Sequence, residues 1–410
     1  MREYERMKKA LIITTISGFV PQFEMNQVFL LQKLGYEVHY ATNFDHPVYD
    51  YDRELFRKNG IVTHPLSIEK SPARIGRNFQ AFLQLKRLLT RERFDLIHCH
   101  NPMGGVLGRL AGSLYSSGSA ILYTAHGFHF YKGAPIRNWL LYYPAEYILA
   151  RLTDFLITIN EEDYLRGKRF PLRPNGSVWK IPGAGLDVRR FVPRPDARAA
   201  RKAALGFPAD SFLLLSAGEL NRNKNHETVI RALSLLPEKN VCYGICGRGD
   251  GRGRLEELIE REGLSERVRL LGYRKDIEDV LPAADCFLFP SKREGFGMAA
   301  VEAMAAGLPL ITSDCRGTRE YMRDGITGIV CKRNRPEDYA EAIRSLRNDP
   351  GQREHMRQAA RERSLLFSTD ATQAVMRQVY EAALQSREYA AGHKKASFRR
   401  QRRASKNIRA

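Results

Sequence analysis

Short apolar runs alternate with longer amphipathic segments along the first half of the chain. Each run is rich in branched or aromatic residues and is followed by turn residues, as buried strands are. Six such alternations predict a parallel sheet with helices on both faces and with ligands near the carboxyl ends of its strands. The predicted strands are LIITTISG after Ala10, GYEVHYATN, IVTHPLSI, DLIHCH, AILYTAHG and TDFLITIN.

The second half repeats this alternation after a segment dense in Gly and Pro. That segment, Pro182 to Pro195, is typical of a hinge between two compact domains. A final amphipathic helix begins after Ser368, a plausible N-cap, and a highly basic segment follows it. The pattern predicts an N-terminal domain over 1–185, a C-terminal domain over 186–366, a last helix over 367–386 and a disordered tail over 387–410.

The stretch SKREGFGMAAVEAMAAGLPL carries two carboxylates eight residues apart, Glu294 in a predicted loop and Glu302 in a predicted helix. Eight helical residues rise about 12 Å, so the two groups are too far apart to act on one bond as an acid/base pair. Between them lie the amides of Gly295, Phe296 and Gly297, at a helix N-terminus that favours an anion such as a diphosphate.

A nucleotide-sugar matches this layout, because it has hydroxyl groups at one end, phosphates in the middle and a ribose diol at the other end. The alternative is that both carboxylates are merely solvated, as most glutamates are. Glu302 argues against that alternative, since its helix is rich in Ala, Met and Val and has little other charge.

The same stretch resembles the Glu-x7-Glu signature of the family 4 retaining glycosyltransferases, including those of bacterial exopolysaccharide and capsule synthesis. The resemblance covers Lys9 to Gln385. It implies the α/β fold called GT-B, in which two Rossmann-like domains face each other across a cleft. The last helix then crosses back to the N-terminal domain.

The resemblance also implies roles for individual residues. His126, in TAHGF, and Glu294 would position the donor sugar as the catalytic pair, while Glu302 would hold the ribose. Two of the implied donor-binding residues keep a structural alternative. Lys224 starts a predicted helix, where a lysine is often simply exposed to solvent, and Tyr273 ends a predicted strand, where an aromatic side chain often serves only for packing. The implied donor-binding residues are Lys224, Gly295, Phe296, Gly297, Glu302, Tyr273 and Gly18.

The sequence departs from the family pattern at Glu219, where the family has an arginine that grips the diphosphate. A carboxylate there would repel phosphate. Arg222 lies close enough in the same loop to compensate, and Lys224 retains the second phosphate contact.

Neither a metal nor another cofactor is expected. His98 and His100 fall on one face of a strand without an evident third ligand, and the family holds phosphates with amides and cations. The six cysteines lack a CxxC pair, which favours buried, reduced thiols in a cytosolic protein.

The net charge of +20 calls for an acidic partner, and +8 of it lies in the tail. No nucleic-acid motif is present, so an anionic membrane is the favoured partner. The basic amphipathic segment 72–93 is either a solvated and packed helix or a second membrane contact. No apolar run approaches 18 residues, which predicts a cytoplasmic protein on the inner face of the plasma membrane.

The expected function is retaining transfer of a sugar from a nucleotide-sugar to a glycan or a polyprenyl-diphosphate-linked acceptor, with a uridine diphosphate sugar as the expected donor. A nucleotide-sugar-binding partner subunit without catalysis is the alternative that the Glu219 departure leaves open. A nucleic-acid binder has only the charge in its favour.

Overall fold

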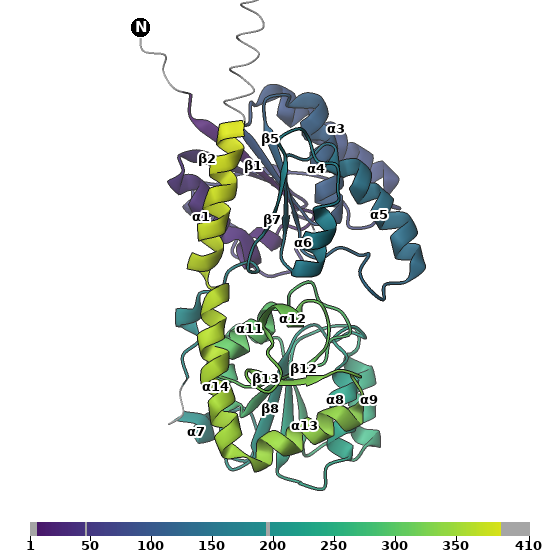
Figure 1. Cartoon of the computed structure of the whole chain (residues 1–410), viewed down its shortest axis with the longest axis vertical. Coiled ribbons are helices and arrows are strands. Elements are labelled where there is room, and N and C mark those ends of the chain that lie inside the picture. Colours follow the sequence, from purple (N-terminus) through teal and green to yellow (C-terminus); the bar gives the residue numbers. More distant parts are fainter. Residues whose placement is uncertain (1–5, 46, 194–196, 387–410) are drawn as a thin grey trace, which may run out of the picture. The chain divides into compact units, whose positions relative to one another are not determined.

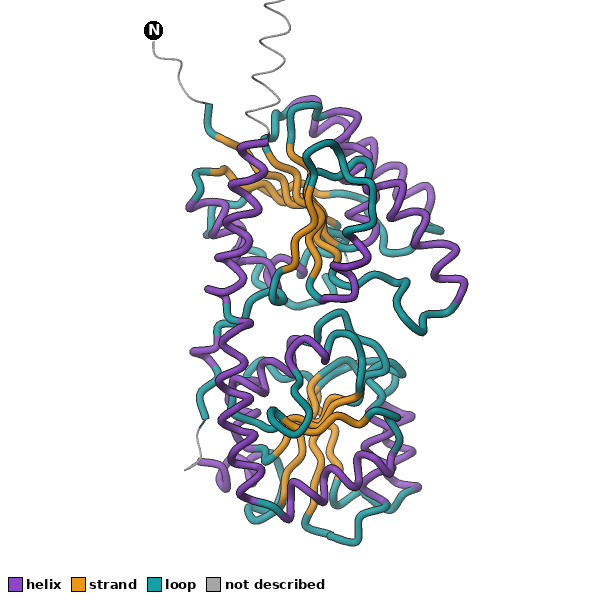
Figure 2. The backbone as a smooth tube through the Cα atoms, in the orientation of Figure 1, coloured by secondary structure: helices purple, strands orange, loops and turns teal. Residues whose placement is uncertain are grey.

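The computed structural model describes residues 6–45, 47–193 and 197–386, and two compact units divide them. The first unit contains the chain up to Ile181 and again from Thr372 onward, and the second is Pro182–Ala371. In each unit the strands lie at the centre and the helices surround them (Figures 1 and 2). The six cysteines are all buried and unbridged, as expected.

The first unit is built on a seven-stranded sheet in the order β3-β2-β1-β4-β5-β6-β7, and every pairing is parallel. The chain builds outward from β1 in one direction and from β4 in the other, so these two neighbours mark the point where the strand order reverses. Its strands are β1 (Lys8–Ile13), β2 (Tyr36–Thr42), β3 (Val62–Pro65), β4 (Leu96–His100), β5 (Ala120–Ala125), β6 (Phe155–Thr158) and β7 (Ser177–Lys180). Its helices are η1 (Val20–Glu24), α1 (Met25–Lys33), α2 (Glu54–Lys58), α3 (Ile75–Arg91), α4 (Pro102–Tyr115), α5 (Ile136–Ala150) and α6 (Glu161–Gly167).

The second unit has a six-stranded parallel sheet in the order β10-β9-β8-β11-β12-β13, with its reversal between β8 and β11. Its strands are β8 (Phe212–Ala217), β9 (Val241–Cys246), β10 (Val268–Gly272), β11 (Cys286–Phe289), β12 (Leu310–Ser313) and β13 (Gly328–Cys331). Its helices are η2 (Val188–Arg190), α7 (Arg198–Ala204), α8 (His226–Ser234), α9 (Arg252–Arg261), α10 (Ile277–Val280), η4 (Leu281–Ala283), α11 (Met298–Ala305), α12 (Thr318–Tyr321), α13 (Pro336–Asn348), α14 (Pro350–Ser364) and η5 (Leu365–Phe367).

Burial explains why these segments form central strands. All six residues of β5 and all six of β9 are buried, as in parallel strands covered by helices on both faces. Both sheets have the strand order of a Rossmann fold, so the predicted pair of Rossmann-like domains is confirmed.

The last helical segment, 369–386, packs against the first unit as the fold prediction required. Ser368 caps it, since its hydroxyl accepts a 3.2 Å hydrogen bond from the amide of Ala371. Further along, the Gln373 side chain donates to the carbonyl of Asn26, and the buried Tyr380 hydroxyl lies 3.1 Å from His98 Nδ1. The predicted tail, 387–410, lies outside the described residues.

Helix α3 belongs to the segment 72–93, for which the sequence left two alternatives, a packed helix or a membrane contact. Leu85 and Leu89 are buried in the core of the first unit, and only Ile75 and Phe79, 75% and 60% exposed, project from its first two turns. Most of the apolar side is therefore a packing face. Within the described residues, no helix is both long and apolar enough to cross a bilayer.

Candidate active site

The predicted donor-binding residues of the second unit gather where its strand order reverses. The loop after β8 carries Lys224, and the loop after β11 carries Glu294. Because β8 and β11 are neighbouring parallel strands, both loops leave the same edge of the sheet side by side. Ligands of Rossmann-like folds bind at this place.

Asn221 shapes the first of these loops. Its side-chain oxygen accepts hydrogen bonds from the amides of Asn223 and Lys224, each at 2.9 Å, which closes a tight turn. Asn223 ties this turn to the second loop, because its carbonyl accepts from the Lys292 amide and its side chain donates to the Arg293 carbonyl. The two loops therefore form one hydrogen-bonded rim.

The turn GRGD, residues 247–250, packs its backbone against the loop that carries Lys224. Gly247 has a φ of +155°, and a Cβ at that position would collide with the backbone oxygen of Gly218. The amide of Leu220 also donates to the carbonyl of Arg248. This turn therefore acts as close backbone packing behind the Lys224 loop.

Lys224 and Glu294 meet at the rim, with 2.7 Å between Nζ and Oε1. The ammonium also lies 5.0 Å from the centre of the Phe289 ring. Both side chains are mostly buried, at 20% and 13% exposed, so their charges are only partly screened by water. A cation held beside a carboxylate can bind a phosphate while the carboxylate accepts from a hydroxyl group.

Gly295 to Gly297 lead directly into α11. Gly297 has a φ of +96°, and a Cβ there would approach the Phe289 ring to 2.7 Å. The Phe296 side chain is 3% exposed and packs edge-on against Tyr321 and Phe367, so only its backbone is positioned to bind a ligand. The segment presents a helix N-terminus beside Lys224 and Glu294, which favours an anion.

Glu302 lies on α11, whose other residues are Ala, Met and Val, as predicted from the sequence. Burial raises the pKa of its carboxyl group to about 7, with nearby Arg190 lowering it and Glu278 raising it. Arg190 is itself paired with Glu278 at 2.7 Å. Arg190, the cation near Glu302, is therefore engaged by Glu278, and the Glu302 carboxyl group can accept hydrogen bonds from a ligand.

Three other predicted residues have less direct placements. Arg222 is exposed and lines a hollow of about 440 Å³ beside α8 and α9, and among the described residues Glu294 pairs with Lys224 rather than with Arg222. Tyr273 follows β10 and is 43% exposed, and the Arg248 guanidinium carbon lies over the Tyr273 ring, 5.0 Å from the ring centre. Gly18 is buried in the first unit, where a Cβ would collide with the backbone of Tyr49.

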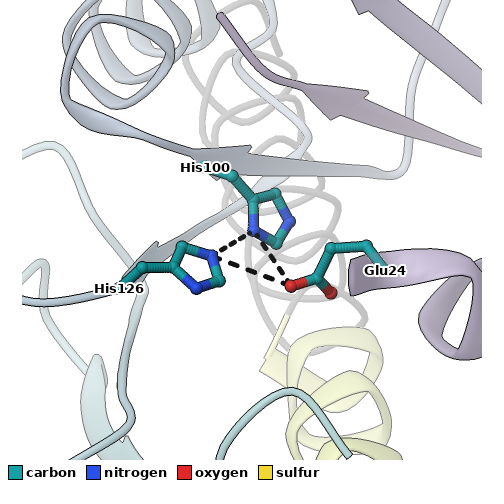
Figure 3. Close-up of side chains that lie close together, drawn as sticks. All are labelled: Glu24, His100 and His126. Carbon is teal, nitrogen blue, oxygen red and sulfur yellow. Dashed lines mark hydrogen bonds and ion pairs between the residues drawn. The ribbon is translucent and has the colours of Figure 1, made fainter. Parts of the chain in front are cut away.

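His126 follows β5 in the first unit and joins a cluster that the sequence did not predict. Its Nε2 lies 3.1 Å from His100 Nδ1, and Oε1 of Glu24 lies 3.7 Å from both nitrogens (Figure 3). Burial lowers the pKa of His126 to about 4 and that of His100 well below its usual value, and it raises the pKa of Glu24 to about 8.

Sequence reasoning missed Glu24, His100 and Arg316 as members of a site. Glu24 ends the π-helical turn η1, and His100 was interpreted as structural. Arg316 is 7% exposed, and its guanidinium donates to the Glu294 carbonyl at 3.3 Å. The available signal was weak: each residue only follows a strand or a turn, and the contacts join distant segments.

Comparison with known proteins agrees with this architecture. The sequence profile described as Glycosyltransferase Family 4 matches residues 26–179, and that of Glycosyl transferases group 1 matches 197–363. EpsD of Bacillus subtilis, a protein named as a glycosyltransferase, is 38% identical over 92% of this chain and 97% of its own. The Escherichia coli UDP-Gal:alpha-D-GlcNAc-diphosphoundecaprenol alpha-1,3-galactosyltransferase is 25% identical over 82% and 87%.

Among solved structures, Anabaena HepE in complex with UDP and glucose superposes with a TM-score of 0.75. It covers 92% of this chain and 100% of its own at 18% identity. WaaG, a glycosyltransferase involved in lipopolysaccharide biosynthesis, gives a TM-score of 0.68 over 90% and 99% at 19% identity. At these identities the structures show the shared fold, and together with the sequence matches they show that this chain belongs to the family 4 glycosyltransferases and is a glycosyltransferase of the GT-B fold.

Proposed function

We propose that the protein transfers a sugar, with retention at the anomeric carbon, from a UDP-sugar to a glycan or polyprenyl-diphosphate-linked acceptor in surface polysaccharide synthesis. Two comparisons support the chemical classes. The Escherichia coli relative has UDP-Gal and a diphosphoundecaprenol acceptor in its name, and HepE was solved with UDP and with UDP-glucose.

The observation that carries the proposal is the Lys224–Glu294 pair beside the N-terminus of α11. A cation, a helix N-terminus and a carboxylate lie together at the strand-order reversal of the second unit. This grouping has the charges that a glycosyl diphosphate needs: positive potential for the phosphates and an acceptor for sugar hydroxyl groups.

The proposed reaction breaks the bond between the anomeric carbon and the donor phosphate oxygen. Lys224 and the Gly295–Gly297 amides stabilise the charge that grows on the departing diphosphate. The acceptor oxygen bonds to the anomeric carbon on the face the phosphate leaves, and its proton passes to a phosphate oxygen. Retention follows, and no protein base is required.

Glu302 binds the ribose diol in this proposal, and Glu294 positions the sugar. The family resemblance assigns His126 to the sugar as well, and Tyr273 and Gly18 to the donor. Arg222 would serve as a further phosphate contact in place of the family arginine that Glu219 replaces. The diphosphate is neutralised by these groups, so no metal is invoked for its departure.

We also propose that the protein acts in the cytoplasm, on the inner face of the plasma membrane. Two surfaces of the first unit support contact with lipid. Ile75 and Phe79 are exposed at the start of α3 beside Arg74 and Arg77, and α5 exposes a larger apolar set. The exposed apolar residues of α5 are Ile136, Leu140, Leu141 and Ile148.

The experiment is a transfer assay with a panel of UDP-sugars and a polyprenyl-diphosphate-linked acceptor, read by mass spectrometry. One donor should give a product one sugar heavier, and proton NMR of that product should show the donor's anomeric configuration. A product of inverted configuration contradicts retention. Donor binding without transfer or hydrolysis for every sugar contradicts the enzyme and favours a nucleotide-sugar-binding subunit.

A further inference from the structure

Three possible metal ligands of the first unit converge on one point. Glu24 comes from the end of η1, His100 from the end of β4 and His126 from the loop after β5 (Figure 3). Their nearest ligand atoms are Glu24 Oε1, His100 Nδ1 and His126 Nε2, and all lie within 4.8 Å of one another. We call these residues the His–His–Glu cluster.

We propose that the His–His–Glu cluster binds one divalent first-row transition metal, best matched by Zn²⁺, through these three atoms and with a fourth position open. Two imidazoles and one carboxylate are a known ligand set of zinc sites that keep an open position. The same ligands also suit other first-row divalent ions, so the chemistry specifies the class more firmly than the element.

The distances fit such a site. Zinc binds imidazole nitrogen at about 2.0–2.1 Å and carboxylate oxygen at about 2.0–2.2 Å, so tetrahedral ligands lie roughly 3.3–3.5 Å apart. In the cluster the nitrogen–nitrogen distance is 3.1 Å and both nitrogen–oxygen distances are 3.7 Å. Shifts of a few tenths of an ångström would bring all three atoms to metal-binding distance.

Hydrogen bonding explains only part of this arrangement. The two imidazoles can share one proton at 3.1 Å, but Glu24 Oε1 lies beyond hydrogen-bonding distance of both nitrogens. An oxygen equally distant from two ring nitrogens is compatible with one cation bound by all three atoms.

The neighbours of the cluster restrict its rings. Phe19 packs edge-on against His126 with 4.9 Å between ring centres, and His98 lies 4.2 Å from His100. His100 Nε2, however, has no hydrogen-bond partner among the described residues. Such outer partners contribute about 10–100-fold to metal affinity, so we expect micromolar rather than nanomolar binding.

The His–His–Glu cluster belongs to the first unit, whereas Lys224 and Gly295 to Gly297, the proposed phosphate contacts, belong to the second. The metal would bind His126 through Nε2 and leave Nδ1 for a hydrogen bond to a ligand. The proposal therefore concerns the orientation of His126 and does not place a metal on the donor diphosphate.

The test uses the full chain, expressed without a polyhistidine tag and stripped of metal with a chelator. Calorimetric titration with ZnCl2 should give one ion per chain at micromolar Kd. Substitution with Co²⁺ should give the intense visible bands of a tetrahedral ion, and Zn²⁺ should raise the thermal midpoint.

Glu24→Gln, which is nearly isosteric, and His100→Asn should each weaken Zn²⁺ binding by about 100-fold or more, because a direct ligand contributes more than an outer partner. His355→Asn, at an exposed histidine on α14, is the matched control and should bind like the parent. Circular dichroism identifies any variant that fails to fold. Absence of one-to-one binding by the parent, or parental affinity in either folded ligand variant, overturns the proposal.

Discussion

Lys224 Nζ lies 2.7 Å from Glu294 Oε1, so the two residues that the sequence connects with donor chemistry form an ion pair across neighbouring loops. The pair is held by backbone contacts between the loops, including the Asn223 carbonyl and the Lys292 amide at 2.8 Å. The protein itself therefore holds the lysine in place without a donor. The carboxylate beside the lysine can accept hydrogen bonds from the hydroxyl groups of a phosphate ester that the lysine binds.

Lys224→Met should weaken UDP binding by roughly 10- to 150-fold, because a charge-assisted phosphate contact contributes about 1.5–3 kcal/mol. Glu294→Gln should change UDP affinity by less than about threefold and mainly lower kcat, since Glu294 is proposed to contact the sugar. Calorimetry with UDP and a transfer assay measure the two effects. Lys239→Met, at an exposed lysine of the same unit, is the control. Equal losses of UDP affinity in the Lys224 and Glu294 variants would contradict this division of roles.

Glu302 should make stability depend on pH. Burial raises the pKa of the folded carboxyl group to about 7, above its unfolded value of 4.5, so the folded state binds the extra proton. The free energy of unfolding should therefore fall as pH rises from about 4.5 to 7. A full shift of this size corresponds to about 1.4 kcal/mol per pKa unit, which partial exposure reduces to about 1–2 kcal/mol in total.

Glu302→Gln removes this titration. Its thermal midpoint should exceed that of the parent by a few degrees at pH 8, and the gap should shrink toward pH 5. Differential scanning calorimetry at both pH values measures the gap. A gap that stays constant or widens at the lower pH would show that Glu302 is ionised throughout.

Gly297→Ala should damage both stability and donor binding. The position has a φ of +96°, and the added methyl group would lie 2.7 Å from the Phe289 ring. Such backbone strain costs about 1–3 kcal/mol before the collision is counted. Gly253→Ala on α9 is the matched control, because its methyl group would meet nothing within 4 Å and alanine favours helix. Thermal midpoints and UDP affinities of the two variants should diverge, and a Gly297 variant equal to its control would contradict the proposed loop geometry.

Leu140→Ser combined with Leu141→Ser should reduce binding to vesicles containing anionic phospholipid. Both side chains are exposed on α5, at 72% and 60%, so the change removes apolar contact area without opening the core. Leu235→Ser, at a 48% exposed leucine of the second unit, is the control. Vesicle flotation at constant salt measures the effect, and unchanged flotation of the α5 double variant would remove α5 from the membrane proposal.

The parallel sheets were predictable because their strands are buried on both faces and read as short apolar runs, as LII at 11–13 and CFLF at 286–289 do. The loop position of Glu294 and the helical position of Glu302 were also correct, since Gly and Pro mark both ends of their segment. Local composition determines such features directly.

Features that depend on long-range packing were not predictable. The sequence left open whether the apolar side of 72–93 packs or contacts a membrane, because periodicity alone does not say what covers Leu85 and Leu89. The proximity of Glu24 to His100 and His126 arises from a π-helical turn after β1, which has no spacing signal. The roles of His126, Lys224, Glu302 and Tyr273 stay predictions.

The central claim is that Lys224 and Glu302 bind different parts of one nucleoside diphosphate, and calorimetry with UDP and 2′,3′-dideoxy-UDP tests it most directly. The account predicts that the parent and Lys224→Met prefer UDP by about tenfold or more, although Lys224→Met binds both ligands more weakly. Glu302→Ala should lose this preference. A Glu302→Ala variant that still discriminates like the parent would contradict the account.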